Sequence, residues 1–285
     1  MPLTNQNIEE PVSESGAADV VSKSFLNTHQ WLQPVIVFAI LLGVWEILSR
    51  VGMLDPFFMP PPSTLAQTLV ELITEGFPEN ILLHTHILVT LKRSIIGYLI
   101  AVALAIPIGI LIGYFQVLDI ATQPFVTFGR STAPISILPL FIAVFDIGEV
   151  SKIALITFAC FWATVTNTIA GVKFVDPILL RAAQSMDTSR IRTFVEVILP
   201  AATPRIFAGL KVSLAIAFMV IVAAEMIATV FGLGALINEA RTWFRTDITM
   251  VGMFVIGVIG YVASIGLDRL EHRLIPWSQA SRSSE

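Results

Sequence analysis

Residues 99–106 read LIAVALAI, and every position in this stretch is apolar. The stretch lies inside a longer apolar run from Leu88 to Tyr114. A strand of a membrane β-barrel alternates polar and apolar residues, because its two faces meet lipid and an aqueous lumen. A helix of about 20 apolar residues, in contrast, crosses a hydrocarbon core of roughly 30 Å. The run therefore predicts a transmembrane helix and an all-α fold.

The composition of the 285-residue chain also indicates a membrane protein. Hydrophobic residues make up 55% of it, charged residues make up 13%, and the mean hydropathy is +0.81, whereas soluble domains carry about 25% charged residues. The net charge of −4 provides no basic surface for nucleic acid. The single cysteine, Cys160, cannot form an intrachain disulfide. His84 and His86 supply only two metal ligands, so we predict no metal site.

Five further apolar runs bring the expected number of transmembrane helices to about six. They cover residues 34–51, 125–145, 153–172, 206–230 and 250–267, and Pro134 and Pro139 are expected to break the run at 125–145. The transmembrane domain is therefore expected over residues 34–277, between an acidic N-terminal tail (1–33) and a short C-terminal tail (278–285). Ser63 is expected to cap a short surface helix, Glu46 to anchor packing of the first span, and Lys92 and Arg93 to snorkel to the interface.

Basic residues in short loops predict the orientation, because such loops stay in the cytoplasm. Five of them lie between the fourth and fifth spans, four in the loop 173–204 and the fifth directly after it: Lys173, Arg181, Arg190, Arg192 and Arg205. Six spans place both termini on one side of the membrane. We therefore expect the 173–204 loop and both termini to be cytoplasmic.

The same loop has the pattern of two short amphipathic helices. Asp176 and Pro177 are suited to begin the first helix, in which Leu179, Ala182, Ala183 and Met186 recur at helical spacing. After a break at 187–189, Ile191, Phe194, Val195 and Ile198 repeat the spacing until Leu199 and Pro200, which are expected to end the second helix. The bilayer surface, nucleic acid or a groove on another protein would cover such a helix pair. Nucleic acid is disfavoured, because the pair lacks a dense basic face.

The loop resembles a known signature. Arg181-Ala182-Ala183, three residues, Asp187, nine residues, and then Val197-Ile198-Leu199-Pro200 resembles the cytoplasmic "EAA" signature of bacterial ABC importer permeases, Glu-Ala-Ala, three residues, Gly, nine residues, Ile-x-Leu-Pro. Arg181 replaces the acidic residue, as is usual in the branch that imports sulfonates, taurine and nitrate. Asp187 replaces the turn glycine, and aspartate tolerates turns and can cap the following helix.

In that family the loop is the coupling helix that docks in a cleft of the ATPase subunit. The resemblance assigns ATPase coupling to the following residues: Leu179, Arg181, Ala182, Ala183, Met186, Asp187, Ile191, Phe194, Leu199 and Pro200. Weaker motifs in the same order extend the resemblance over about Pro34 to Trp277: 58–62, 106–109, 147–153, 223–227, 232–234 and 273–277.

The resemblance implies a type I ABC importer permease in a bacterial inner membrane. Its expected partners are a second copy of this chain, two ATPase subunits that bind ATP and magnesium, and an external solute-binding protein that docks near Pro60 and Gly232. The sequence holds no Gly-x4-Gly-Lys-Ser/Thr nucleotide loop and no nucleophile elbow. The chain is therefore expected to be no enzyme and to carry no cofactor of its own.

The branch favours a small organic anion such as taurine or a sulfonate as the solute. Nitrate, bicarbonate or a pyrimidine precursor is the alternative within the same importer class. An ion-coupled secondary transporter and a membrane-embedded enzyme are the rival classes, and co-purification of an ATPase would separate them from an ABC importer.

Polar groups inside spans are candidates for the solute pathway, because they are costly in lipid unless they face one another or water. The fourth span carries a polar stripe that includes Thr157, Cys160, Thr164, Asn167 and Thr168. The third span contributes Arg130, Ser131, Thr132 and Ser136, and the fifth contributes Glu225. Hydrogen bonding between helices is the alternative role for each Ser and Thr. Arg130 would attract an anion, pair with Glu225 or cap a helix end, and the sequence leaves these roles open.

Overall fold

The computed structural model describes residues 32–78 and 80–275, and these residues form helices and loops with no strand among them. The predicted tails, apart from Leu32 and Gln33, and the motif residues Pro276 and Trp277 lie outside the described residues. The helices are α2 (Leu32–Arg50), α3 (Pro62–Thr74), α4 (Leu83–Tyr114), α5 (Gln116–Ser131), η1 (Pro134–Ile137), α6 (Leu138–Phe145), α7 (Glu149–Lys173), α8 (Pro177–Ser185), α9 (Arg190–Thr193), η2 (Phe194–Ile198), α10 (Leu199–Ala228), α11 (Leu233–Thr242) and α12 (Thr246–Leu274). The all-α prediction is confirmed.

The chain divides into two compact units at Ser63. In the first unit, Glu46 on α2 binds the start of α3. Its carboxylate accepts from the Ser63 hydroxyl (2.8 Å), the Ser63 backbone N–H (3.1 Å) and Nε of Arg50 (2.6 Å). Because α3 already begins at Pro62, Ser63 lies inside the first turn. The prediction of Ser63 as an N-cap is therefore wrong, and its hydroxyl donates a hydrogen bond to Glu46 instead.

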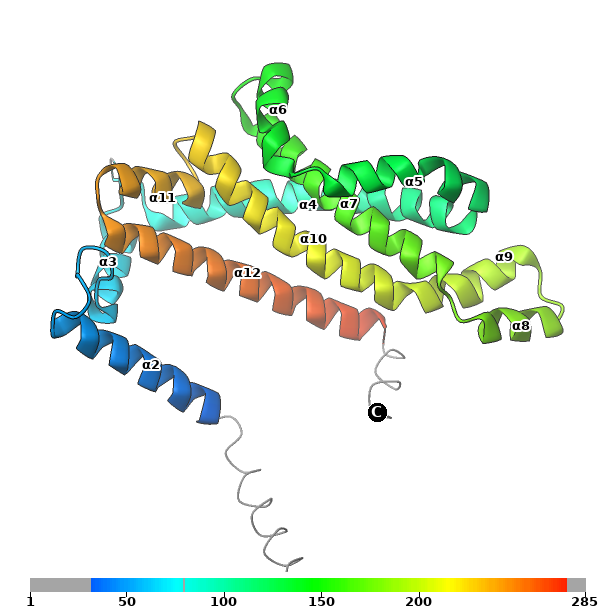
Figure 1. The fold of residues 1–285 in the computed structure, drawn as a ribbon, viewed down its shortest axis with the longest axis horizontal. Helices are drawn as coiled ribbons and strands as arrows, with labels where there is room; N and C mark the ends of the chain where they lie inside the picture. Colours follow the sequence, from blue (N-terminus) through cyan, green and yellow to red (C-terminus); the bar gives the residue numbers. More distant parts are fainter. Residues whose placement is uncertain (1–31, 79, 276–285) are drawn as a thin grey trace, which may run out of the picture. The chain divides into compact units, whose positions relative to one another are not determined.

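In the second unit, α4, α7 and α10 run alongside one another and enclose the main core (Figure 1). The core holds small residues such as Ala101 and Ala159 between larger ones such as Leu155 and Ile221. Gly109 on α4 lies directly against α7, because a Cβ atom there would stand 2.6 Å from Cβ of Thr168. The small residues of α4 therefore bring two helices of this chain into close contact.

A second core joins α11 and α12 to the end of α3. Leu72, Leu236 and Ile248 are buried in it. The Thr68 hydroxyl donates to Oδ2 of Asp247 at 2.9 Å, which ties α3 to the first turn of α12. The surface helix predicted after the proline-rich loop is therefore packed against its own bundle through Leu72.

Four helical stretches of the described residues are long and apolar enough to cross a membrane: α4, α7, Arg190–Ile227 and α12. The bent pair Gln116–Ser131 and Pro134–Phe145 raises the number to five if it is one span. We expected about six spans, and α2, which coincides with the first of them, is outside this set.

The third span is broken at Pro134, as predicted, and its two halves meet at 90°. Pro139, the other expected break, lies instead in the first turn of α6. The bend falls at Thr132 and Ala133, whose extended backbones (ψ 127° and 116°) precede Pro134. A proline lacks an N–H donor and pushes the preceding residue out of the helical region. In Figure 1, α6 turns away from α5 at this point.

The predicted end of the second loop helix at Leu199 and Pro200 is also wrong. The chain stays helical from α9 through η2 into α10. η2 is a π-helical turn in which the Leu199 N–H donates to the Phe194 carbonyl, five residues back. This wider turn precedes Pro200, which then lies in the first turn of α10, where a missing N–H is tolerated. The loop helix and the fifth span are therefore continuous.

Candidate functional site

The 173–204 loop is a rigid angle rather than a loose connection. Asp176 caps α8 as predicted, with Oδ1 accepting from the Ile178 N–H at 2.8 Å. The Thr188 hydroxyl donates to the Ala183 carbonyl (2.8 Å) and contacts the Thr193 hydroxyl (2.9 Å). These bonds tie the turn to α8 on one side and to α9 on the other.

Asp187 makes the turn in the left-handed conformation, with φ at +50°. Glycine is favoured there, and aspartate is among the residues that tolerate it. The bend that we expected at this position is present. The side-chain cap of α9 comes from Ser189, whose Oγ accepts from the Arg192 N–H at 3.4 Å, and not from Asp187.

The loop presents an apolar face to its surroundings. Met186 is 76% exposed, Ile191 79% and Ile178 64%, and Leu179 is also exposed. Arg181, Ala182 and Asp187 are exposed as well, whereas Phe194, Leu199 and Pro200 are half-buried. Ala183, which we had also assigned to the docking face, is 6% exposed. It therefore lies inside the loop, and Ile178, which the prediction missed, takes part in the exposed face.

At the other end of the bundle, Glu225 is fully buried and fully bonded. Its carboxylate accepts from Nη1 of Arg93 (2.7 Å), the Thr90 hydroxyl (2.8 Å) and the Gly234 N–H (3.0 Å). Nε of Arg93 also donates to Glu149 at 2.7 Å. Glu225 therefore pairs with Arg93 rather than with Arg130. The prediction that Arg93 snorkels is wrong, since it is 3% exposed.

We call Arg93, Glu149 and Glu225 the arginine cluster. It holds the loop before α11: Nη1 of Arg93 donates to the Phe231 carbonyl at 2.7 Å. Gly232 adopts a φ of +126°, and a Cβ atom there would stand 2.3 Å from the Glu225 carboxyl. His86 is buried in α4 against the Gly232 backbone, whereas His84 is exposed. The two histidines therefore do not converge on one site.

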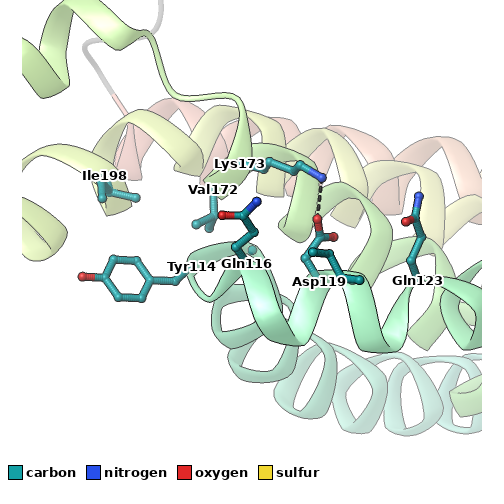
Figure 2. A pocket seen from close by; sticks show the side chains of 9 residues that line it. Tyr114, Gln116, Asp119, Gln123, Val172, Lys173 and Ile198 are labelled. Atoms are coloured by element: carbon teal, nitrogen blue, oxygen red, sulfur yellow. Dashed lines mark hydrogen bonds and ion pairs between the residues drawn. The ribbon is translucent and has the colours of Figure 1, made fainter.

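A polar groove runs between α5 and α7, and Figure 2 shows part of it. It consists of two cavities, of about 480 and 200 Å³, which share Asp119 and Gln123. Gln116 and Lys173 line the larger cavity, and Lys173 donates to Oδ2 of Asp119. The smaller cavity is lined in part by Arg130, Thr127 and Thr166.

The groove holds more positive than negative charge. Its ionisable lining residues are two cations, Arg130 and Lys173, and one carboxylate, Asp119. The carboxylate is paired with Lys173, and no described acidic residue pairs with Arg130, which is exposed. One positive charge therefore remains unneutralised, which favours an anion in the groove.

Of the predicted pathway residues, only Arg130 lines this groove. Thr157 lines a separate apolar depression and donates to the Gly97 carbonyl at 3.1 Å. Cys160, Thr164 and Thr168 are fully buried in helix packing, and no described residue bonds the Thr164 hydroxyl. The others bond within their own segments or are exposed: Ser131 is exposed, and Thr132, Ser136 and Asn167 bond to the carbonyls of Phe128, Ala133 and Ala163.

Sequence reasoning missed Gln116, Asp119, Gln123 and Lys173. A signal for the first three existed, because residues 116, 119, 123, 127 and 130 are polar at helical spacing. Beginning the third span at Phe125 left the first part of this stripe in a presumed loop. Lys173 was counted only as a loop charge.

Helices long and apolar enough to cross a membrane, an exposed apolar loop and a groove lined in part by charged side chains indicate a membrane transport protein. Residues 105–278 match the family described as "Binding-protein-dependent transport system inner membrane component", and the chain belongs to this family. It is thus a permease component of an ABC transporter and not an enzyme.

Relatives of known name cover nearly the whole chain. The taurine transport system permease protein TauC of Escherichia coli (strain K12) is 36% identical over 84% of this chain and 87% of its own. SsuC of Bacillus subtilis (strain 168), provisionally named an aliphatic sulfonates transport permease protein, is 29% identical over 93% and 94%. The nitrate import permease protein NrtB of Synechocystis sp. (strain ATCC 27184 / PCC 6803 / Kazusa) is 28% identical over 90% and 94%.

Proposed function

We propose that this chain forms the membrane pathway of an importer for a small organic anion of the sulfonate or taurine type. The names of TauC and SsuC support the substrate class. The unneutralised positive charge of the groove, with Arg130 exposed in it, suits an anion. Nitrate is the second candidate, because NrtB is also similar over nearly the whole chain. Bicarbonate and a pyrimidine precursor rank below nitrate as candidate solutes.

The exposed face of the 173–204 loop carries the proposal. An apolar surface held on a rigid element is stabilised when a partner covers it. We infer that this partner is an ATPase subunit, which binds ATP and magnesium and moves the loop as it closes. In the complete importer, two copies of this chain would meet two ATPase subunits in a bacterial inner membrane, with the loop and both termini in the cytoplasm. An external binding protein would deliver the solute.

The proposed docking contact is tested by introducing a charged side chain on the exposed face of the loop. Met186→Asp should weaken the ATPase contact, because an aspartate cannot be buried unpaired without a large cost. The control is Gln184→Asp, an exposed position roughly opposite Met186 around α8. We expect Met186→Asp to lose taurine uptake and ATPase binding in reconstituted vesicles, and the control to keep both. Ala183 is unsuitable for this test, since a charge there would disrupt the inside of the loop.

Equal uptake and equal ATPase binding by both variants would refute docking through this face. Uptake driven by an ion gradient without any ATPase subunit would instead support a secondary transporter. Competition between taurine and nitrate for uptake by the wild-type complex separates the two substrate candidates.

A further inference from the structure

One ion pair lies where the polar groove meets the 173–204 loop, which we call the coupling loop after its proposed function. Lys173 is the last residue of α7 and the first residue of the 173–204 loop, and its Nζ donates to Oδ2 of Asp119 in the first turn of α5. Figure 2 shows the two side chains meeting across the groove. This pair therefore joins the helix that carries Arg130 to the loop that carries the docking face.

The pair is easy to open. Lys173 is 47% exposed and Asp119 is 16% exposed. A partly hydrated ion pair contributes little net stability, because each ion exchanges water contacts for its partner. Asp119 is the less exposed member, and its place in the first turn of α5 suits a carboxylate, since a helix N-terminus favours negative charge. When the pair parts, we expect Lys173 to move and Asp119 to stay.

The connection from Lys173 to the docking face is short and is anchored at Val175. Asp176, the N-cap of α8, follows Lys173 by three residues. Val175 is 8% exposed, and the Phe174 ring, although 67% exposed, lies 5.7 Å from the Arg205 guanidinium on α10. Because the connection is short and anchored, we expect a displacement of α8 to move Lys173 as well.

We propose that the Asp119–Lys173 pair is a latch that the coupling loop operates. In the closed latch, Asp119 neutralises Lys173, and Arg130 is the remaining cation of the groove. When the ATPase draws α8 away, the pair opens, and the free Lys173 ammonium receives the anion that has passed along the groove from Arg130. This proposal rests on the proposed function. In it, the Lys173 ammonium favours anionic over neutral or cationic solutes.

A reversible bridge tests the latch in the complete transporter. In the double variant Asp119→Cys, Lys173→Cys, a short bis-methanethiosulfonate reagent joins the two thiols, and a reductant releases them. Uptake is measured in ATP-loaded vesicles that contain the complete complex with its ATPase subunits and binding protein. The reference is the same complex after the bridge has been reduced. We expect the bridge to lower taurine uptake at least about tenfold and reduction to restore it, because a step that needs the motion cannot proceed.

Two controls accompany the bridge. The wild type should not respond to the reagent, since its single cysteine, Cys160, is fully buried. The pair Lys211→Cys, Asp268→Cys joins α10 and α12 at another partly exposed ion pair, away from the groove, and its bridge should leave uptake unchanged. A bridged Asp119/Lys173 variant that imports taurine as fast as its reduced form would overturn the latch.

A second variant, Asp119→Asn, tests the latch even if the double cysteine variant does not transport taurine. Asp119→Asn keeps the shape of the side chain and leaves Lys173 permanently unlatched. We expect the number of taurine molecules imported per ATP to fall by about tenfold, because loop motion and groove are no longer linked. Asp268→Asn removes a carboxylate from the Lys211 ion pair and should leave that ratio unchanged. An unchanged ratio in Asp119→Asn would overturn the latch.

The wild-type complex separates this proposal from the proposed function. If it imports taurine and the variants behave like it, the latch fails and the function stands. If it hydrolyses ATP but imports neither taurine nor nitrate, the proposed function fails. The latch is then judged by ATP hydrolysis, and a bridge that leaves the hydrolysis rate unchanged overturns it.

Discussion

At the N-terminal end of α7, Glu149, which is 60% exposed, pairs with Arg93, which is 3% exposed, whereas at its C-terminal end Lys173, 47% exposed, pairs with Asp119, 16% exposed. The first pair belongs to the arginine cluster, in which every donor to Glu225 comes from a different residue. A buried charge must keep all its partners, so the cluster fixes geometry. A hydrated pair loses little when it opens. One helix therefore joins a fixed end to an end that is free to move.

The largest effect is expected where a buried charge loses its partner. Arg93→Ala leaves Glu225 buried without its cation, and we expect a loss of stability of about 3–5 kcal/mol. Thermal unfolding of the purified chain in detergent measures it. Arg192→Ala, which breaks an exposed ion pair with Glu196 in the 173–204 loop, is the control and should cost about 0.3–0.5 kcal/mol.

A double variant sharpens this prediction. Arg93→Met with Glu225→Gln removes both buried charges, so it should recover much of the stability that Arg93→Ala loses. If Arg93→Ala and Arg192→Ala unfold at the same temperature, the arginine cluster is not the fixed end of the bundle.

A smaller loss is expected at Gly232. Its φ of +126° disfavours any side chain, and an added Cβ atom would collide with the Glu225 carboxyl. Gly232→Ala should therefore cost about 1–3 kcal/mol. Gly257→Ala on α12, where a Cβ atom meets nothing within 4 Å, should be neutral or stabilising by up to about 1 kcal/mol. Equal melting temperatures for the two alanine variants would show that the Gly232 loop is not held against Glu225.

The smallest effect is expected in the 173–204 loop. Thr188→Val removes the hydroxyl that ties the turn to Ala183 and Thr193, at a cost of about 1 kcal/mol. Because the loop is exposed, the loss should appear as faster amide hydrogen exchange over residues 183–193 with little change in the melting temperature. Ser185→Ala, which removes an exposed hydroxyl bond to Arg181, is the control. Faster exchange throughout α10 would contradict a local role.

Much of this fold follows from the sequence because the signals are local. Apolar runs predicted α4, α7, α10 and α12, and Asp176 predicted the start of α8. The break at Pro134 was predicted correctly, whereas the predicted helix end at Pro200 was wrong. The outcome at a proline depends on whether the neighbouring turns can widen or must break. Composition cannot decide between these outcomes.

The candidate site was predictable in part. The helical spacing of residues 179–186 marked an amphipathic helix, but the same pattern placed Ala183 on the docking face, and the structure buries it. A repeat identifies the apolar side of a helix without telling which of its residues meet the chain itself. The Arg93–Glu225 pair joins residues 132 positions apart, and nothing local links them. Such partners become visible only when the helices are packed.

The most direct test of docking through α8 is site-directed cross-linking to the ATPase subunit. Met186→Cys and Ala183→Cys differ by less than one helical turn, yet Met186 is 76% exposed and Ala183 is 6% exposed. In the assembled complex, a thiol-specific photo-crosslinker on Met186→Cys should capture the ATPase subunit, and the label on Ala183→Cys should not. Capture of the subunit only from Ala183→Cys, or from neither position in a transporting complex, would contradict docking through this face.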